Sequence, residues 1–222
     1  SWCEGSTYLA TGYSHTNISD DDGQTWRDGG RVKPEGGPCY EPACIELKDG
    51  RIGPLQRILS GLPPGGRHPN RTLGFGPDGW LYITVGSTCN CCVEDHPEAA
   101  AIVRIRPDGS AREIFATGLR NTVGFGWHLP TGRMFGMDHG TDYLGDDFPP
   151  EELNELRAHR NYGWPFVYAK GQVIRLPHPP PGLDIAAYAA ASTHSVLETT
   201  AHSSPLQMTF YTGSQFPTDY RN

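Results

Sequence analysis

Short apolar runs that end at tight-turn dipeptides recur along this chain. Asp-Gly or Thr-Gly dipeptides occupy positions 22–23, 49–50, 78–79, 108–109 and 131–132. Asp and Gly both tolerate the positive φ that a tight hairpin turn requires. Apolar runs lie beside the later turns, at 73–75, 80–85, 102–105 and 125–128. Short strands with regularly spaced turns predict an all-β protein, either a β-propeller or a β-sandwich.

Chain length sets the size of such a propeller. One blade has four strands and takes roughly 40–50 residues, so the 222 residues predict a single domain of about five blades. Helical patterns are sparse. The segment 149–156 has prolines and acids at its front, as a helix start does, and 185–192 is rich in alanine. We therefore expect short helices in the loops of an all-β fold.

Composition narrows the function classes. Glycine (28) and proline (20) are frequent, but 36% of the residues are hydrophobic, which argues for a folded, turn-rich domain. The net charge of −7 argues against a nucleic-acid or anionic-membrane partner. No apolar run approaches 20 residues, so no membrane span is expected. The chain opens directly at Ser1, as expected of a mature or trimmed chain.

Six cysteines leave two alternatives open. They are Cys3, Cys39, Cys44, Cys89, Cys91 and Cys92. The cluster at 89–92 lacks the paired spacing of a zinc ribbon and a haem-attachment motif, although a metal or redox site stays an alternative. Disulfides of an exported protein are favoured, with the pairing left open. Glycosylation-type sequences at 17–19 and 70–72 agree with export. A secreted or periplasmic location is expected.

The segment 19–26 carries a specific hairpin motif. It fits the pattern S-x-D-x-G-x-T-W at every fixed position and resembles the Asp-box of sialidase-type propellers. The polar side chains can bond the turn's own backbone, and Trp26 can pack beneath it. We expect residues 1–54 to form an Asp-box-containing blade. Tyr40 and Glu41 are adjacent, so on a strand they would face opposite sides, and no sialidase site can be assembled.

From about residue 55 onward the chain resembles a second family. Five segments carry the resemblance, in the family's order: 66–73 with 75–87, 118–128, 138–147, 149–166 and 202–217. They are similar to the soluble glucose/sorbosone dehydrogenases. The resemblance implies six-bladed β-propellers that carry pyrroloquinoline quinone (PQQ) and calcium. Residues 55–222 are expected to form quinoprotein-dehydrogenase-like blades.

The resemblance implies a role for four polar residues. His68 stands where the family has its general base, which takes the sugar hydroxyl proton while hydride moves to the quinone. Arg120 and Asn121 match the family's Arg-Asn pair over the quinone, where a guanidinium stabilises developing negative charge. His139 takes the place of a polar side chain that contacts PQQ.

The resemblance also implies two calcium sites. Gly140 and Thr141 match positions whose backbone carbonyls bind the cofactor calcium, as hard oxygen ligands do. Five carboxylates crowd the next stretch: Asp142, Asp146, Asp147, Glu151 and Glu152. One alternative is a solvated acidic loop. The other is a second calcium held by Glu152 and the carbonyl of Tyr162.

The chain departs from the family pattern at both ends. In the family a further stretch follows 202–217, with basic residues that clamp the PQQ carboxylates and strands that close the ring. The sequence ends at Asn222, so we expect weaker PQQ binding. The Asp-box segment stands where the family has its first blades. The propeller is therefore expected to be partial, chimeric or completed in a homo-oligomer, since open strand edges associate.

Two function classes remain open at this point. The first is PQQ- and calcium-dependent oxidation of an aldose or related sugar, with electrons passed to an external acceptor because no haem motif is present. The second is a non-catalytic β-propeller scaffold or carbohydrate-binding module. A sialidase-like hydrolase is the weakest alternative. Whether the chain is an enzyme thus depends on whether the quinone site is complete.

Overall fold

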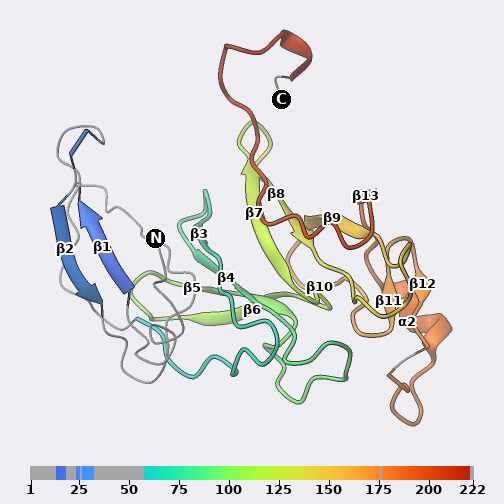
Figure 1. Ribbon diagram of the computed structural model, residues 1–222. Coiled ribbons are helices and arrows are strands. Elements are labelled where there is room, and N and C mark those ends of the chain that lie inside the picture. Colours follow the sequence, from blue (N-terminus) through green and yellow to red (C-terminus); the bar gives the residue numbers. More distant parts are fainter. Residues whose placement is uncertain (1–13, 19–23, 26, 33–57, 176, 221–222) are drawn as a thin grey trace. The chain divides into compact units, whose positions relative to one another are not determined.

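A computed structural model describes residues 14–18, 24–25, 27–32, 58–175 and 177–220 (Figure 1). The chain divides into two compact units, Ser1–Leu55 and Gln56–Asn222. In the first unit, β1 (Ser14–Ile18) and β2 (Arg27–Val32) form an antiparallel hairpin. The Asp-box falls between these strands, but residues 19–23 and 26 of the motif lie outside the described residues. The Asp-box therefore stays a prediction.

The second unit contains two larger sheets (Figure 1). The first has the order β10-β6-β5-β4-β3, and the second has the order β13-β9-β8-β7. The strands of the first sheet are β3 (Leu73–Phe75), β4 (Leu81–Val85), β5 (Ala101–Ile105), β6 (Arg112–Thr117) and β10 (Arg160–Asn161). Those of the second are β7 (Thr122–His128), β8 (Arg133–Asp138), β9 (Glu151–Leu156) and β13 (Leu197–Thr199). In each sheet the longer strands follow one another as an antiparallel meander, which is the arrangement of a propeller blade.

Three small elements complete the second unit. The strands β11 (Val167–Tyr168) and β12 (Gln172–Val173) form a hairpin. The α-helix α2 spans Ile185–Ala191, and a 3₁₀ turn, η1, spans Thr218–Tyr220. Asp184 caps α2 by accepting hydrogen bonds from two amides of its first turn. Among the described residues, no helix has the length and apolar character needed to cross a bilayer.

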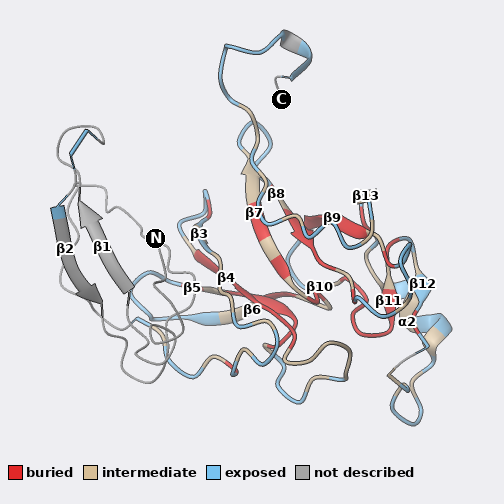
Figure 2. Ribbon diagram, viewed as in Figure 1, coloured by how far each residue is buried: buried red, intermediate tan, exposed pale blue. Residues whose placement is uncertain are grey.

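An aromatic core joins the two sheets, and Figure 2 shows the buried segments of their strands in red. Tyr82 on β4 makes edge-to-face contacts with Phe115 on β6, at 5.0 Å, and with Trp127 on β7, at 5.2 Å between ring centroids. Met134 and Leu156 bring β8 and β9 into the same cluster. Edge-to-face pairs are favoured by the ring quadrupoles and add to the burial of apolar area. The strands of both sheets are thus held in one apolar layer.

The turns and strands expected from the sequence are confirmed where the structure describes them. Gly79, Gly109 and Gly132 have φ of 77°, 75° and 67°, and each stands between two consecutive antiparallel strands. The four apolar runs at 73–75, 80–85, 102–105 and 125–128 all contribute to strands. The dipeptides at 22–23 and 49–50 lie outside the described residues. The short helix expected near 185–192 is also present.

One expectation needs correction. The helix predicted over 149–156 is instead the strand β9, because its backbone pairs with β8 on one side and β13 on the other. Packing in a sheet outweighs the helix preference of its glutamates. The described part of the chain contains two blade-like sheets and the hairpins β1–β2 and β11–β12, so the expected number of about five blades stays a prediction. Long connections, such as 139–150, take residues that a compact blade would use in strands.

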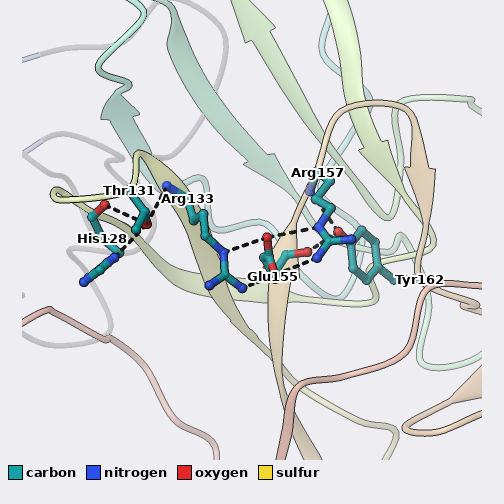
Figure 3. Close-up of polar contacts among 6 residues, drawn as sticks. All are labelled: His128, Thr131, Arg133, Glu155, Arg157 and Tyr162. Atoms are coloured by element: carbon teal, nitrogen blue, oxygen red, sulfur yellow. Dashed lines mark hydrogen bonds and ion pairs between the residues drawn. The ribbon is translucent and has the colours of Figure 1, made fainter. Parts of the chain in front are cut away.

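Two arginines share one carboxylate at the end of the second sheet (Figure 3). Glu155 on β9 accepts bidentate hydrogen bonds from Arg133, with Nε at 2.9 Å, and from Arg157, with Nε at 3.0 Å. Tyr162 donates its hydroxyl to the Glu155 carbonyl and accepts from the Arg157 amide. Hydrogen bonds from both guanidinium groups lower the pKa of Glu155 to about 2. This cluster fixes the turn after β9.

Replacing this carboxylate should destabilise the fold in a pH-dependent way. Glu155→Gln is expected to lower the free energy of unfolding by about 1–2 kcal/mol at pH 7, the size of a charged hydrogen-bond contribution. Because the folded pKa lies below the unfolded value, this stabilisation is present above about pH 4.5 and is lost as pH falls toward 2. Urea unfolding at pH 7 and at pH 3 measures it.

The matched control is Glu198→Gln, whose partner Lys170 lies 4.0 Å away and is 64% exposed. An exposed pair of this kind contributes about 0–1 kcal/mol. Equal losses in the two variants would contradict the assignment.

Candidate functional site

His68 lies just before β3 and binds the end of β4. Its Nδ1 donates a hydrogen bond to the carbonyl oxygen of Ser87 at 2.7 Å. Burial lowers the pKa of His68, and the positive charge of Arg120 lowers it further, while the bond to Ser87 acts in the opposite direction. With Nδ1 protonated, Nε2 carries the lone pair. Among the described residues, none forms a hydrogen bond with Nε2.

Ser87 joins His68 to the connection between β6 and β7. Its amide donates to the Arg120 carbonyl at 2.7 Å, while its own carbonyl accepts from His68. Its hydroxyl donates to the Glu94 carboxylate. Ser87 is fully buried, so all three bonds form away from solvent. The backbone positions of His68 and Arg120 are therefore coupled through one residue.

The Arg120 guanidinium is buried and surrounded by protein acceptors. Its Nε and Nη2 donate to the carbonyl and the Oδ1 of Asn90, at 3.0 and 2.5 Å. Its Nη1 donates to the carbonyls of Gly140, at 2.7 Å, and His139, at 3.2 Å. The guanidinium carbon lies 5.5 Å from the centroid of the Trp164 ring. These four bonds leave one of the five guanidinium N–H hydrogens for a ligand.

Asn121 and His139 lie beside His68. Asn121 Nδ2 is 3.5 Å from His139 Nδ1, and His139 Nε2 donates to the Pro205 carbonyl at 2.8 Å. Gly86 separates Asn121 from His68, because a Cβ at Gly86 would come within 2.5 Å of His68 Cβ and 3.1 Å of Asn121 Oδ1. The structure thus brings together the four residues expected at the quinone: His68, Arg120, Asn121 and His139.

Asp138 organises this end of the sheet, although the sequence analysis did not identify it. Its carboxylate accepts from the amides of Arg120 and Asn121, each at 3.0 Å, and from the Thr122 hydroxyl at 2.7 Å. Burial raises the pKa of Asp138, and the hydrogen bond from Thr122 opposes that shift. Its position in the sequence, directly before the predicted site residues 139–141, is the feature that could have identified Asp138.

A small acidic cavity lies next to Asp138. It has a volume of about 20 Å³ and is lined by Asp138, Thr141, Glu152 and Tyr162 among others. Glu152 faces Asp138 across β8 and β9, and its carboxylate accepts from the Ala169 amide at 2.6 Å. Burial and the charge of Asp138 raise the pKa of Glu152 to about 7. Among the described residues, none is a hydrogen-bond partner of the buried Thr141 Oγ1.

The expected calcium ligands are only partly gathered in this cavity. Thr141, Glu152 and Tyr162 line it together with Gly140, but the Gly140 carbonyl already accepts from Arg120. Glu151 points to other partners, accepting from the amides of Gly140 and Ser204. The remaining members of the acidic stretch are exposed: Asp142, Asp146 and Asp147. The acidic stretch therefore combines buried carboxylates with a solvated loop.

A disulfide closes the loop that follows β4. Cys89 and Cys92 are joined, which confirms the disulfide alternative for this pair. Their sulfurs lie near the Glu94 carboxylate, but paired sulfurs are not metal ligands. Burial raises the pKa of the Cys91 thiol. Cys3, Cys39 and Cys44 lie outside the described residues.

Comparison with known proteins identifies the family. The Glucose / Sorbosone dehydrogenase family matches residues 43–222. An uncharacterised protein of Borreliella burgdorferi is 32% identical over 148 residues, which are 64% of this chain and 36% of that protein. An uncharacterised Synechocystis protein is 29% identical over 129 residues, 47% of this chain and 30% of that protein. The chain thus spans about a third of the length of these relatives.

Solved structures of sugar dehydrogenases share the fold. The soluble aldose sugar dehydrogenase of Escherichia coli, in its apo form, has a TM-score of 0.56 at 18% identity, covering 79% of this chain and 53% of that one. The pyranose dehydrogenase PQQ domain of Coprinopsis cinerea, in its holo form, has a TM-score of 0.53 at 20% identity, covering 66% and 46%.

A calcium structure of a Trichoderma reesei enzyme of Carbohydrate-Active Enzymes Family AA12 has a TM-score of 0.55 at 22% identity, covering 65% of this chain and 46% of that one. These similarities show part of a β-propeller fold. The family match extends through both large sheets and every residue expected at the quinone and calcium sites. This chain belongs to the glucose/sorbosone dehydrogenase family.

Proposed function

We propose that this chain carries the proton-transfer part of a PQQ- and calcium-dependent site that oxidises a sugar hydroxyl. The observation that carries the proposal is His68, with Nδ1 bonded to Ser87 O and Nε2 left to accept a proton. Its lowered pKa keeps the imidazole neutral at physiological pH, as a general base requires. The structures named for PQQ and for sugar oxidation support the substrate and cofactor classes.

The donor set around His68 suits a quinone that carries carboxylates and carbonyls. Asn121 Nδ2 and the remaining Arg120 hydrogen are donors, and Arg120 brings a buried positive charge. A guanidinium held by several acceptors is preorganised and need not rotate when a ligand arrives. The chemistry that bound PQQ supplies in such a site is acceptance of two electrons from the sugar.

Each residue then has a separate task. His68 Nε2 takes the proton from the sugar hydroxyl that is being oxidised. Ser87 fixes the tautomer of His68 and the direction of its ring through the 2.7 Å bond. Arg120 and Asn121 bind oxygen atoms on the cofactor, and His139, anchored to Pro205, supports Asn121. Arg120 and His139 are buried, whereas His68 and Asn121 are half-buried.

The acidic cavity suits calcium. Its side chains offer carboxylate and hydroxyl oxygens, which are the hard ligands that Ca²⁺ prefers. Burial, together with the repulsion between Glu152 and Asp138 when both are ionised, raises the pKa of Glu152. The unpartnered Thr141 Oγ1 adds an oxygen without a competing bond. We assign Glu152, with the Tyr162 carbonyl, to a calcium site whose charge stabilises the ionised pair. The carbonyls of Gly140 and Thr141 are proposed for the cofactor calcium.

The setting of the reaction follows from the same features. The Cys89–Cys92 disulfide favours a secreted or periplasmic location, where disulfides persist. Electrons leave to an external acceptor. The part of the ring that this chain does not form is supplied by further blades or by a second copy in a homo-oligomer.

Removing the His68 imidazole should abolish turnover and spare cofactor binding. His68→Ala is expected to reduce kcat for dye reduction with aldoses by 10²–10⁴-fold, the usual contribution of a general base, with a nearly unchanged PQQ Kd. The measurement is a PQQ titration with excess Ca²⁺, followed by dye reduction. A folded wild-type chain that binds no PQQ would mean a non-catalytic propeller module.

The pH profile should report the lowered pKa of His68. A base must be unprotonated to act, so kcat/KM is expected to stay high below pH 6.5 and to fall only as pH drops through the lowered pKa. Arg120 raises the free energy of a charged His68, and Arg120→Gln should therefore move this acidic limb to higher pH. An unshifted limb in Arg120→Gln would contradict the coupling.

Calcium affinity should increase with pH around neutrality. The Glu152 pKa of about 7 means that metal binding must displace a proton, so Ca²⁺ affinity is expected to rise between pH 6 and 8. Without metal, a raised carboxyl pKa makes the fold lose stability as pH rises from about 4.5 to 7. Calorimetric Ca²⁺ titrations of wild type and Glu152→Gln test this. Equal affinity in both would place the ion elsewhere.

A further inference from the structure

The loop after β4 determines where the Arg120 guanidinium lies. Asn90 accepts from Nε and Nη2 of that guanidinium, through its backbone carbonyl at 3.0 Å and its side-chain Oδ1 at 2.5 Å. Its Nδ2 donates in the opposite direction, to Asp142 Oδ1 at 2.6 Å. Reversing the amide would set a donor against a donor at Arg120 and an acceptor against an acceptor at Asp142. The orientation of the Asn90 side chain is thus fixed from both sides.

The loop that carries Asn90 is closed in two ways. The Cys89–Cys92 disulfide joins the residues on either side of it. Glu94 folds back and accepts from the amide and hydroxyl of Thr88, at 3.0 and 2.6 Å. Cross-links of this kind reduce the number of conformations open to a short loop. Because the loop is already restrained, Asn90 loses little further conformational entropy when it binds Arg120.

We propose that Asn90 is a positioning residue for the sugar-oxidising site and that the Cys89–Cys92 disulfide keeps it in place. The inference rests on the proposed function, because Arg120 is the cofactor-binding group that Asn90 directs. Without the Asn90 side chain, Nη2 loses its acceptor, and the guanidinium retains the backbone carbonyls of Asn90, His139 and Gly140. The Nη2 hydrogens, one of which is left for a ligand, then lose their fixed direction.

Cofactor affinity should then depend on the redox state of the loop. A dithiol reduces the S–S bond to two thiols and is itself oxidised to a disulfide. The opened loop holds Asn90 less firmly, although Glu94 still binds Thr88. Reduction is therefore expected to weaken PQQ binding without unfolding the sheets.

The first test needs no cofactor. Hydrogen exchange of the Arg120 Nη2–H that donates to Asn90 Oδ1 is followed by NMR in the full chain. Asn90→Ala is expected to accelerate it at least about tenfold, as loss of a charged hydrogen bond should. The Arg120 backbone amide, which donates to Asp138, should keep its protection. The control is Gln172→Ala on the exposed β11–β12 hairpin, which should change neither.

A charge-neutral exchange provides the rescue. In Asn90→Asp with Asp142→Asn, one carboxylate oxygen can accept from Arg120 and the other from the new amide. This double variant is expected to restore the slow Nη2–H exchange that Asn90→Ala loses. Fast backbone exchange in all the variants, or unchanged Nη2–H exchange in Asn90→Ala, would overturn the positioning role.

The second test measures PQQ Kd, with excess Ca²⁺, by quenching of tryptophan fluorescence. Asn90→Ala is expected to weaken binding about tenfold and the double exchange to restore it. Pretreatment with dithiothreitol, which is removed under nitrogen before PQQ is added because dithiols reduce quinones, should weaken binding to the wild type and leave Cys89→Ser/Cys92→Ser unaffected. Insensitivity of the wild type to reduction would overturn the role of the disulfide. A wild type that binds no PQQ defeats the proposed function, whereas the exchange experiment still decides the role of Asn90.

Discussion

The rest of the site depends on the buried carboxylate of Asp138. It lies at the end of β8 and accepts two consecutive amides and a hydroxyl from the first residues of the neighbouring chain segment. These bonds fix the backbone from which Arg120 and Asn121 project. The bond from Ser87 to the Arg120 carbonyl then ties that backbone to the loop holding His68. A charge without solvent requires such complete hydrogen bonding, so this carboxylate determines the local geometry.

Much of the fold can be predicted from sequence because its signals are local. A Gly with positive φ after Asp78 or Asp108 needs only its neighbours to form a turn, and the apolar runs beside these turns form strands wherever they are packed. The strand β9 could not be recognised in this way. Its glutamates satisfy a helix pattern, and only the pairing with β8 and β13, with Arg133 and Arg157 on Glu155, makes a strand preferable.

The sequence likewise predicts some residues of the site and not others. The family resemblance pointed to His68, Arg120, Asn121 and His139, and the structure brings these four residues together. Asp138 and Asn90 were not, because their importance comes from contacts with residues 18 and 30 positions away. Sequence spacing gives no sign of such pairs. The interaction of Arg120 with the Gly140 carbonyl likewise follows from the way the 139–141 run folds beside β7.

The buried charges at this end of the sheet are mostly negative even though Arg120 is present. Asp138, Glu151 and Glu152 are all buried, and among the described residues Arg120 is the one arginine that donates to the carbonyls of His139 and Gly140. Glu151 is satisfied by two amides, whereas Glu152 and Asp138 face each other across paired strands. One guanidinium cannot balance three carboxylates, so either a proton or a metal ion must. A proton on Glu152 near neutrality reduces this excess of negative charge. The calcium ion proposed here would reduce it as well.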